Sequence, residues 1–214
     1  MNKFYISIFF FILLQTNVFA SKDNKKNLIK NIEKNISTYN NIALKIWDYA
    51  EVGYKEEKSS KELIQILENN GFKITEGIAG IPTAFIAEYG NGGPVIGILG
   101  EYDALPGLSQ SNNPTKESRV GVNSGHGCGH NLFGVASAAA AIAIKEWLKE
   151  SKTEGTIRFY GCPAEEGGSG KVYMVREGLF DDVDVALHWH PSSKNNASAG
   201  STLANKTGKI RFYG

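Results

Sequence analysis

Residues 132–148 form an alanine-rich stretch that is apolar on almost every side of a helix. A helix of this kind is shielded from water all round, so the stretch predicts a helix packed against a sheet. Four short runs predict the strands of that sheet, and one of them, 95–99, is nearly continuously apolar, as in an interior strand. The runs are 84–89, 95–99, 156–160 and 183–187. Helices that alternate with buried strands predict an α/β fold built in layers.

Two more helices are predicted before the first strand. Apolar residues recur at spacings of three and four along 28–47, which indicates an amphipathic helix. A second helix is predicted over 56–70, and it ends at Gly71, a residue suited to a left-handed cap. Near the end of the sequence, residues 209–213 predict a further strand.

The first twenty residues have the pattern of a secretory signal peptide. Lys3 precedes an apolar run over 4–14, and the small-residue site Val18-Phe19-Ala20 follows. The run is shorter than the roughly 20 apolar residues of a membrane-spanning helix, which disfavours an uncleaved anchor. A buried helix is the other alternative. We expect an exported protein, periplasmic or secreted, with no stable membrane association after cleavage of the signal.

The charge balance gives no reason to expect a nucleic acid as partner. The 214 residues hold 23 Lys and Arg against 22 Asp and Glu, so the formal net charge is +1. Nucleic acids and anionic membrane surfaces attract strongly basic patches. We therefore expect the partner to be a small molecule.

All four histidines lie in two short segments, 124–130 and 187–191. Cys128 and His130 are separated by one glycine, so both side chains can bind one ion from an extended or turning loop. The glycines at 125, 127 and 129 permit the unusual backbone angles of such a loop. Alone, the segment is equally consistent with a glycine-rich turn, and an exported Cys128 could also pair with Cys162.

Acidic residues follow two of the predicted strands. Glu165 and Glu166 come soon after 156–160, and Glu101 and Asp103 come directly after 95–99. Adjacent carboxylates beside a buried strand are costly unless each has a partner, and a divalent ion with its water supplies partners. The alternative is a solvated acidic loop. If the strands are parallel neighbours, these carboxylates meet the thiol and the imidazoles at one sheet edge, which favours a metal site.

The motifs resemble those of the M20 metallopeptidases, in the amidohydrolase branch that includes hippurate and auxin-conjugate hydrolases. The resemblance covers residues 42–214 and is strongest to the aminobenzoyl-glutamate hydrolase B-subunit group. It rests on Glu101-Tyr-Asp-Ala-Leu-Pro-Gly, His126-Gly-Cys-Gly-His-Asn, Pro163-Ala-Glu-Glu-Gly-Gly and Trp189-His-Pro. It implies a layered α/β catalytic domain of the zinc-exopeptidase kind over residues 21–205. Residues 206–214 would begin an inserted lid and dimerisation domain, and the sequence would be an N-terminal fragment.

The resemblance also implies the roles of individual residues. The expected ligands of one or two divalent ions, zinc or manganese, are Cys128, His130, Glu166 and His190. Glu165 is the expected general base, and Asp103 orients a ligand or the ions. His190 is preferred over His188 because it stands six residues after Asp184, which matches the family's spacing. The residues expected around the ligands or in the pocket are His126, His188, Glu101 and Asn131, the last of which stands where many members have Asp.

The implied activity is metal-dependent hydrolysis of the amide bond in a small N-acyl amino acid such as aminobenzoyl-glutamate. The complete protein is expected to be a homodimer or a hetero-oligomer. Two other interpretations stay open. One is a periplasmic metal-binding module that holds an ion without an open coordination position. The other is an inactive fragment with an incomplete site.

Overall fold

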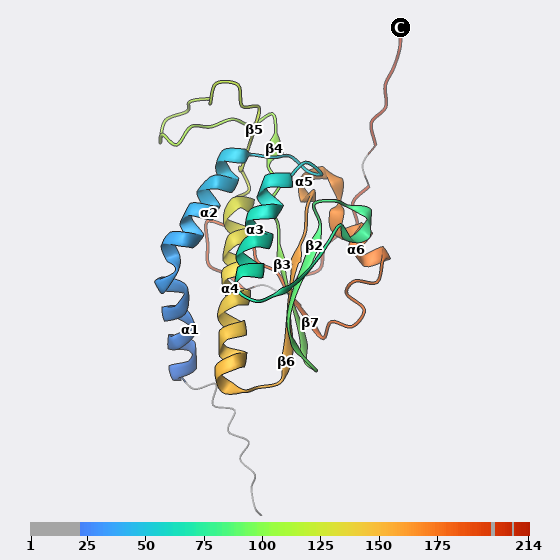
Figure 1. The fold of residues 1–214 in the computed structure, drawn as a ribbon. Helices are drawn as coiled ribbons and strands as arrows, with labels where there is room; N and C mark the ends of the chain where they lie inside the picture. Colours follow the sequence, from blue (N-terminus) through green and yellow to red (C-terminus); the bar gives the residue numbers. More distant parts are fainter. Residues whose placement is uncertain (1–21, 198–199, 207) are drawn as a thin grey trace, which may run out of the picture.

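A five-stranded mixed sheet forms the centre of the computed structural model, which describes residues 22–197, 200–206 and 208–214 (Figure 1). The predicted signal peptide, residues 1–20, lies outside the described residues. The strand order is β1-β2-β6-β3-β7, where β3 pairs in parallel with both β6 and β7. β2 runs antiparallel to β1 and β6. The strands are β1 (Lys73–Glu76), β2 (Phe85–Asn91), β3 (Val95–Gly100), β6 (Gly155–Gly161) and β7 (Val185–Leu187).

Helices cover both faces of this sheet, so the predicted layered α/β fold is confirmed (Figure 1). One face carries the long apolar helix predicted from the sequence, α4 (His130–Ser151), together with three helices that precede the sheet in the chain. These are α1 (Lys22–Lys34), α2 (Ile36–Tyr49) and α3 (Glu57–Asn69). The other face carries the short α6 (Gly170–Arg176), which buries Met174.

The predicted amphipathic helix along 28–47 is confirmed in its helical residues and its buried side, but it is interrupted at Asn35, between α1 and α2. There the side-chain amide of Asn35 donates a hydrogen bond to the backbone carbonyl of Asn31, at 3.0 Å. Asparagine side chains compete in this way with the backbone bonds of a helix interior. The second predicted helix is confirmed as α3, and Gly71 after it has the expected left-handed backbone, with φ 82°.

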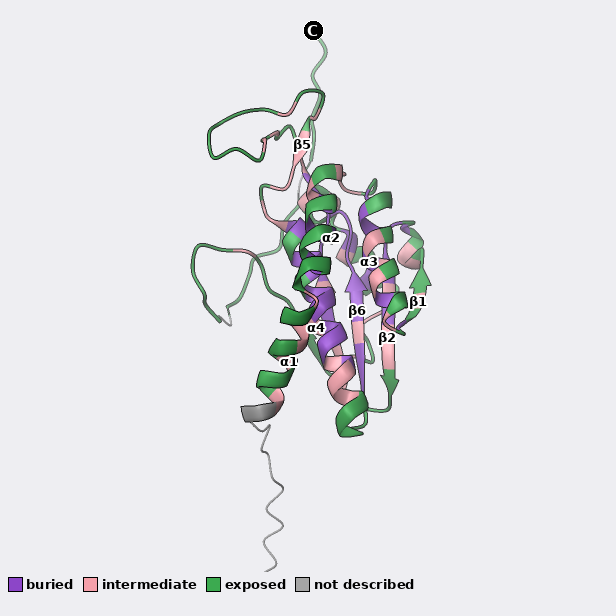
Figure 2. Cartoon of the chain, turned by 60° about the vertical axis from the view of Figure 1, so that its left-hand side comes forward, coloured by how far each residue is buried: buried purple, intermediate pink, exposed green. Residues whose placement is uncertain are grey.

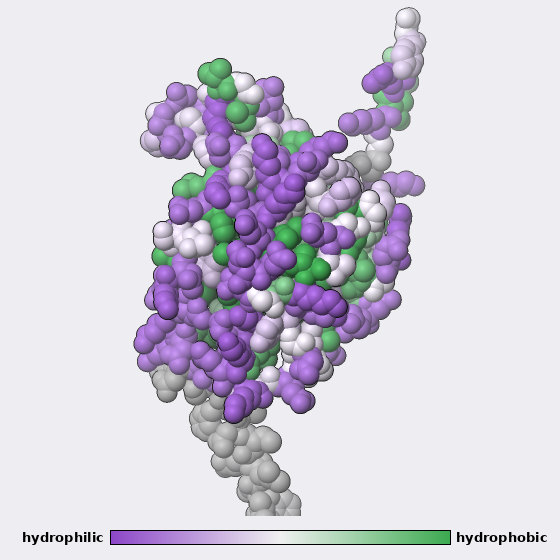
Figure 3. Space-filling view, in the orientation of Figure 1, coloured by the Kyte–Doolittle hydropathy of each residue, from purple (hydrophilic) through white to green (hydrophobic). Residues whose placement is uncertain are grey.

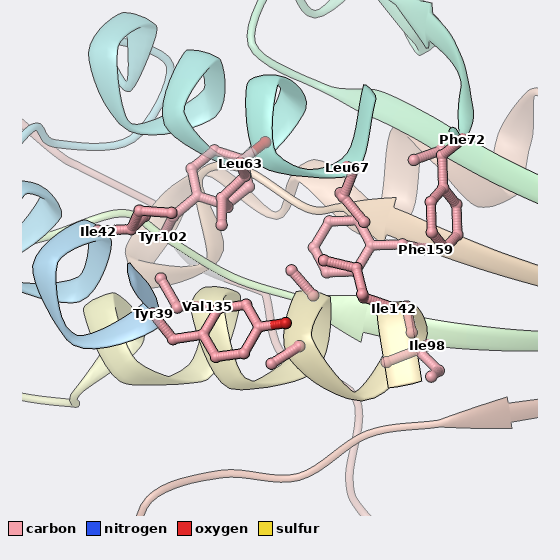
Figure 4. Packing of buried hydrophobic residues seen from close by; sticks show 14 of the residues in the cluster. Tyr39, Ile42, Leu63, Leu67, Phe72, Ile98, Tyr102, Val135, Ile142 and Phe159 are labelled. Carbon is pink, nitrogen blue, oxygen red and sulfur yellow. The ribbon is translucent and has the colours of Figure 1, made fainter. Parts of the chain in front are cut away.

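The main core lies between the sheet and the helices α2, α3 and α4 (Figure 4). Leu63 and Leu67 of α3 and Phe159 of β6 are completely buried there. Phe159 stacks on Phe85 of β2, with ring centroids 5.6 Å apart. Figure 2 shows the same distribution, with buried residues concentrated in β6 and along the inner side of α4.

The predicted strand at 209–213 is wrong. These residues pair with no strand in the described part of the chain, and Ile210, Phe212 and Tyr213 are exposed. The apolar alternation is present, but a strand also needs a neighbour for its backbone hydrogen bonds. The prediction that a lid domain begins at 206 therefore rests on the family resemblance alone.

The visible surface is mainly hydrophilic. On the face seen in Figure 3, apolar side chains show only in separate patches between hydrophilic ones. Among the described residues, no helix has both the length and the apolar character that crossing a membrane requires.

Candidate metal centre

The parallel strands β3, β6 and β7 end at one edge of the sheet, and the segments that follow them carry predicted site residues. α4 begins at the same place, with His130 as its first residue. The structure thus brings these segments together, because parallel neighbouring strands have their carboxyl ends at the same edge of the sheet. Glu101 and Asp103 follow β3, Glu165 and Glu166 follow β6 in the short α5 (Glu165–Gly168), and His188 and His190 follow β7.

His130 lies at the centre of the group and is completely buried. Its Nδ1 atom lies 2.9 Å from Asp103 Oδ1 and 3.1 Å from the backbone carbonyl oxygen of Asp103. Both of these oxygens are acceptors, so we assign a proton to Nδ1. The other ring nitrogen, Nε2, lies 3.0 Å from Glu101 Oε2 and 4.0 Å from Glu165 Oε2. A histidine that donates through one nitrogen to a carboxylate is oriented to bind a metal ion through the other.

Gly134 allows α4 to come this close to the end of β3. A Cβ atom at Gly134 would lie only 2.6 Å from the backbone carbonyl oxygen of Glu101. A Cβ atom essentially never comes this close to a non-bonded atom, so a larger residue would push α4 away from the sheet. The glycine therefore helps to bring His130, one turn earlier, within reach of Asp103.

The charges around His130 favour its protonated form. Burial disfavours the imidazolium, but the hydrogen bond to Asp103, the close approach of Glu101 and the charges of both carboxylates raise the pKa of His130 to about 10. For Glu101, burial alone would raise the pKa, but His130, His188 and Lys171 hold it well below its usual range. The pocket is thus strongly negative and attracts a cation, either a proton or a metal ion.

Cys128, His130 and His190 offer ligand atoms that all lie within 4.8 Å of one another. His190 Nδ1 lies 2.9 Å from the carbonyl oxygen of Pro191, so Nδ1 carries the proton and Nε2 is left for a ligand. Both cysteines are free thiols, and the disulfide between Cys128 and Cys162 is not formed. Hydrogen bonding to Glu166, together with burial, raises the pKa of Cys128 to about 11.

Glu165 and Glu166 differ in exposure although they are adjacent. The Glu165 side chain is 45% exposed, whereas that of Glu166 is 15% exposed. The backbone N–H of Glu166 donates to Asp103 Oδ2 at 2.9 Å, and Glu166 Oε1 is buried without a hydrogen-bond partner among the described residues. Both carboxylates therefore approach His130, at 4.0 Å for Glu165 and 3.9 Å for Glu166, but Glu165 is the more open to solvent.

Buried Glu56 holds the turn that carries this acidic pair. Its Oε1 atom accepts the backbone N–H of Ala164 at 2.8 Å, and its Oε2 atom accepts the hydroxyl of Thr83 at 3.0 Å. Ala164 directly precedes Glu165 and has a left-handed backbone, with φ 58°. An alanine is sterically disfavoured in this region, so the hydrogen bond from Glu56 stabilises a strained turn.

We expect Glu56→Gln to change how stability depends on pH. Burial raises the pKa of Glu56 above its ordinary value of 4.5, although its hydrogen bonds oppose this. The folded state then holds the proton more tightly than the unfolded state, so ionisation of Glu56 lowers stability as pH rises through the folded pKa. Glutamine keeps the acceptor for Ala164 and cannot ionise.

Chemical denaturation of both proteins between about pH 4 and pH 7 tests this linkage. The free energy of unfolding of the E56Q variant, minus that of the unchanged protein, should increase with pH. A difference that stays constant or decreases would show that Glu56 does not titrate as argued.

Three other predicted site residues contact protein groups. His126 Nε2 lies 3.0 Å from the carbonyl oxygen of Ile46, and burial lowers the pKa of His126 to about 4, so this ring is neutral. Asn131 donates its amide to the carbonyl oxygen of Ala43 at 3.2 Å. An aspartate could not make this bond, which accounts for the amide here. His188 Nε2 lies 3.3 Å from Glu101 Oε1.

Of the three glycines in the 124–130 segment, only Gly129 needs a left-handed backbone, with φ 76°. The prediction of unusual angles is therefore confirmed at one position. Gly127 matters for space instead, because a Cβ atom there would lie 2.6 Å from a methyl group of Leu108.

Lys171 of α6 is a site residue that the sequence pattern did not predict. Its Nζ atom donates a short hydrogen bond to Glu101 Oε1, and its side chain is 27% exposed. The sequence offers one indication of this role. Lys171 stands alone six residues after Glu165, and the apolar run Val172-Tyr173-Met174-Val175 follows it directly. That pattern alone does not say which carboxylate the lysine meets.

The donor set fits a divalent metal ion. A thiol and imidazoles suit zinc, while the carboxylates also suit manganese. His130 Nε2, Glu166 Oε1 and Glu101 Oε2 are buried and have no well-directed hydrogen bond among the described residues. Buried polar atoms are rarely left unpaired in native proteins, and a cation would satisfy at least His130 Nε2 and Glu101 Oε2, which lie 3.0 Å apart.

Comparison with known proteins agrees with this arrangement. Residues 97–204 match the family model described as Peptidase family M20/M25/M40. The p-aminobenzoyl-glutamate hydrolase B-subunit of Escherichia coli (strain K12) is 52% identical over 185 residues, which are 86% of this chain and 38% of that protein. The hippurate hydrolase of Campylobacter jejuni is 30% identical over 166 residues, 77% of this chain and 42% of that protein. The chain spans about two fifths of the length of these relatives.

Solved structures show the same fold. A dinuclear metal-binding peptidase from Bacillus subtilis superposes with a TM-score of 0.59 at 26% identity, over 79% of this chain and 44% of that one. An aminobenzoyl-glutamate utilization protein from Klebsiella pneumoniae superposes with a TM-score of 0.55 at 19% identity, over 76% of this chain and 46% of that one. At the latter identity the likeness concerns the fold alone.

Proposed function

The chain belongs to the M20 peptidase family, and from this premise we propose that it supplies the metal-binding part of an amidohydrolase. The proposed reaction is hydrolysis of the amide bond in a small N-acyl amino acid such as p-aminobenzoyl-glutamate. The observation that carries the proposal is the cluster around His130, where a thiol, imidazoles and an unequally exposed carboxylate pair meet. The relative with 52% identity carries the name of such a hydrolase, which supports this substrate class.

Four side chains would hold the ion or ions in this proposal, namely Cys128, His130, Glu166 and His190. A bound divalent ion would acidify a water molecule and polarise the carbonyl group of the amide. Glu165 has a different task, because its carboxylate is open to solvent beside the cluster. It accepts the proton of the attacking water and returns it to the leaving amine. Asp103 fixes His130 through Nδ1 and Glu166 through its backbone N–H.

Amide hydrolysis by the longest natural form of the protein tests the proposal. The assay measures release of the free amine from p-aminobenzoyl-glutamate, hippurate and a panel of other N-acyl amino acids, with and without zinc or manganese. We expect metal-dependent cleavage of at least one of them. Tight metal binding without any turnover would favour the metal-binding module instead, and neither binding nor turnover would indicate an inactive chain.

We also propose that the protein is exported and loses residues 1–20. The support is the apolar run over 4–14, followed by the small-residue site that ends at Ala20. Mass spectrometry of the protein purified from its native cells should find a mature chain that begins at Ser21. Intact Met1 on the mature protein would contradict export by this route.

For the whole protein we propose a homodimer or a hetero-oligomer. The support is the Escherichia coli relative, whose name identifies that protein as one subunit of a hydrolase. Light scattering of the purified protein measures the oligomer directly, and a monomer at working concentration would contradict the proposal.

A further inference from the structure

Glu101 is the most deeply buried carboxylate beside His130, together with Asp103, and it has one oxygen with no well-directed hydrogen bond among the described residues. That oxygen, Oε2, lies 3.0 Å from Nε2 of His130, which is equally buried and equally lacks a well-directed bond. Glu101, His130 and Glu165 together offer ligand atoms within 4.8 Å of one another. A second group consists of Cys128, His130 and His190, and the two groups have only His130 in common.

The proton on Nδ1 of His130 determines whether Nε2 of His130 and Oε2 of Glu101 require a cation beside them. Asp103 presents two acceptor oxygens to Nδ1 of His130, so Nδ1 carries a proton. When Nε2 carries no proton, its lone pair faces the Glu101 carboxylate oxygen, and a metal ion can take the place of that proton. Two acceptors at 3.0 Å repel each other unless a positive charge lies between or beside them.

The spacing of the two atoms suits a shared metal ion. Ligand atoms at about 2.1 Å from one ion lie roughly 3.0 to 3.4 Å apart at octahedral or tetrahedral angles. Glu101 Oε2 and His130 Nε2 are already 3.0 Å apart. Neither residue would have to change its backbone to bind the same ion.

The other oxygen of Glu101 is held in place by cationic or donor groups. Lys171 Nζ donates to Oε1, and His188 Nε2 lies 3.3 Å from it. These contacts orient the carboxylate so that Oε2 faces His130. They also offset the cost of burying its charge. Supporting groups of this kind usually surround a metal-binding side chain and fix its direction.

We propose that Glu101 is itself a metal ligand, which binds a divalent ion together with His130 Nε2 at the end of β3. The inference deepens the proposed function, on which it rests, because it adds a carboxylate to the four expected ligands. Lys171 and His188 act as positioning residues for this ligand. Glu165 borders the same position, so the water from which it takes a proton would lie close to Glu101.

Metal binding by a Glu101→Gln variant tests this proposal without any activity assay. Calorimetric titration with zinc and with manganese gives the affinity, and elemental analysis gives the number of ions per chain. Glutamine keeps the shape of the side chain and an oxygen for Lys171, but it loses the negative charge. We expect the variant to bind one ion fewer, or to bind at least about tenfold more weakly.

Glu62→Gln is the matched control, since Glu62 also pairs with a lysine, Lys45, but lies on α3. It should bind metal like the unchanged protein. Circular dichroism establishes that each variant is folded. If E101Q does not fold, Glu101→Asp replaces it, because aspartate keeps the charge and only retracts the oxygen, and the same loss of affinity is expected.

Equal stoichiometry and affinity in the folded Glu101 variant and the unchanged protein would overturn the assignment of Glu101 as a ligand. An unchanged protein that binds no ion would overturn it too. Failure of the proposed function would give another result. The unchanged protein would then bind metal more tightly than the Glu101 variant does, but it would cleave no amide.

Discussion

Glu165→Gln should abolish most of the amide hydrolysis while the protein keeps its metal ions. Glutamine has nearly the same shape as glutamate, but it cannot accept a proton from water at neutral pH. A positioned general base contributes about 10²- to 10⁴-fold to the rate of such reactions, so kcat should fall by that factor. KM should change little, because the variant leaves the expected metal ligands in place.

Steady-state kinetics and metal analysis of the same preparation check this result together. Glu166→Gln is the informative comparison, because Glu166 is the more buried member of the pair and is expected to bind the ion. That variant should lose metal as well as turnover. If kcat of the E165Q variant is undiminished, Glu165 is not the base, and another group must remove the proton.

Phe159→Ala should cause a large loss of stability. Phe159 is completely buried in β6, between the sheet and the helices on its face (Figure 4). Its ring contacts Phe85 and also fills the space beside Gly100, where a Cβ atom would lie 2.5 Å from the ring. Truncation leaves a cavity that its neighbours cannot fill.

Buried phenylalanine-to-alanine changes cost about 3–5 kcal/mol in the free energy of unfolding. Urea denaturation measures this quantity, and Leu44→Ala is a suitable control because Leu44 is 62% exposed on α2. The control should change stability by less than about 0.5 kcal/mol. A loss below about 1 kcal/mol for F159A would mean that this part of the core is loosely packed.

Local patterns predicted the main fold elements well. The all-round apolar character of 132–148 is that of α4, which packs against the sheet, and the apolar run at 95–99 is the interior strand β3. These patterns are reliable because the spacing and number of apolar residues in a segment depend directly on which of its sides are buried. Residues 209–213 show the apolar alternation of a strand, but a strand also depends on a partner that its own sequence does not specify.

The site was predictable in its residue types and less so in its contacts. Short motifs placed a thiol, imidazoles and carboxylates next to strand ends, and the parallel order of β3, β6 and β7 brings them together. The contacts from Glu56 to Ala164 and from Lys171 to Glu101 join residues 108 and 70 positions apart. Contacts of such separation follow from tertiary packing, and no spacing rule within one segment reveals them.

One titration tests the central claim most directly, namely that the cluster around His130 is the metal centre of an amidohydrolase. Metal is first removed from the longest natural form of the protein, and zinc or manganese is then added stepwise. At each step two quantities are measured. They are the amount of bound ion and the rate of hydrolysis of p-aminobenzoyl-glutamate and of the N-acyl amino acid panel. We predict that turnover rises in proportion to bound ion and stops rising when the site is full, and that Cys128→Ser weakens both. Turnover that is unaffected by removal of metal, or a full metal site without cleavage of any substrate, would contradict the claim.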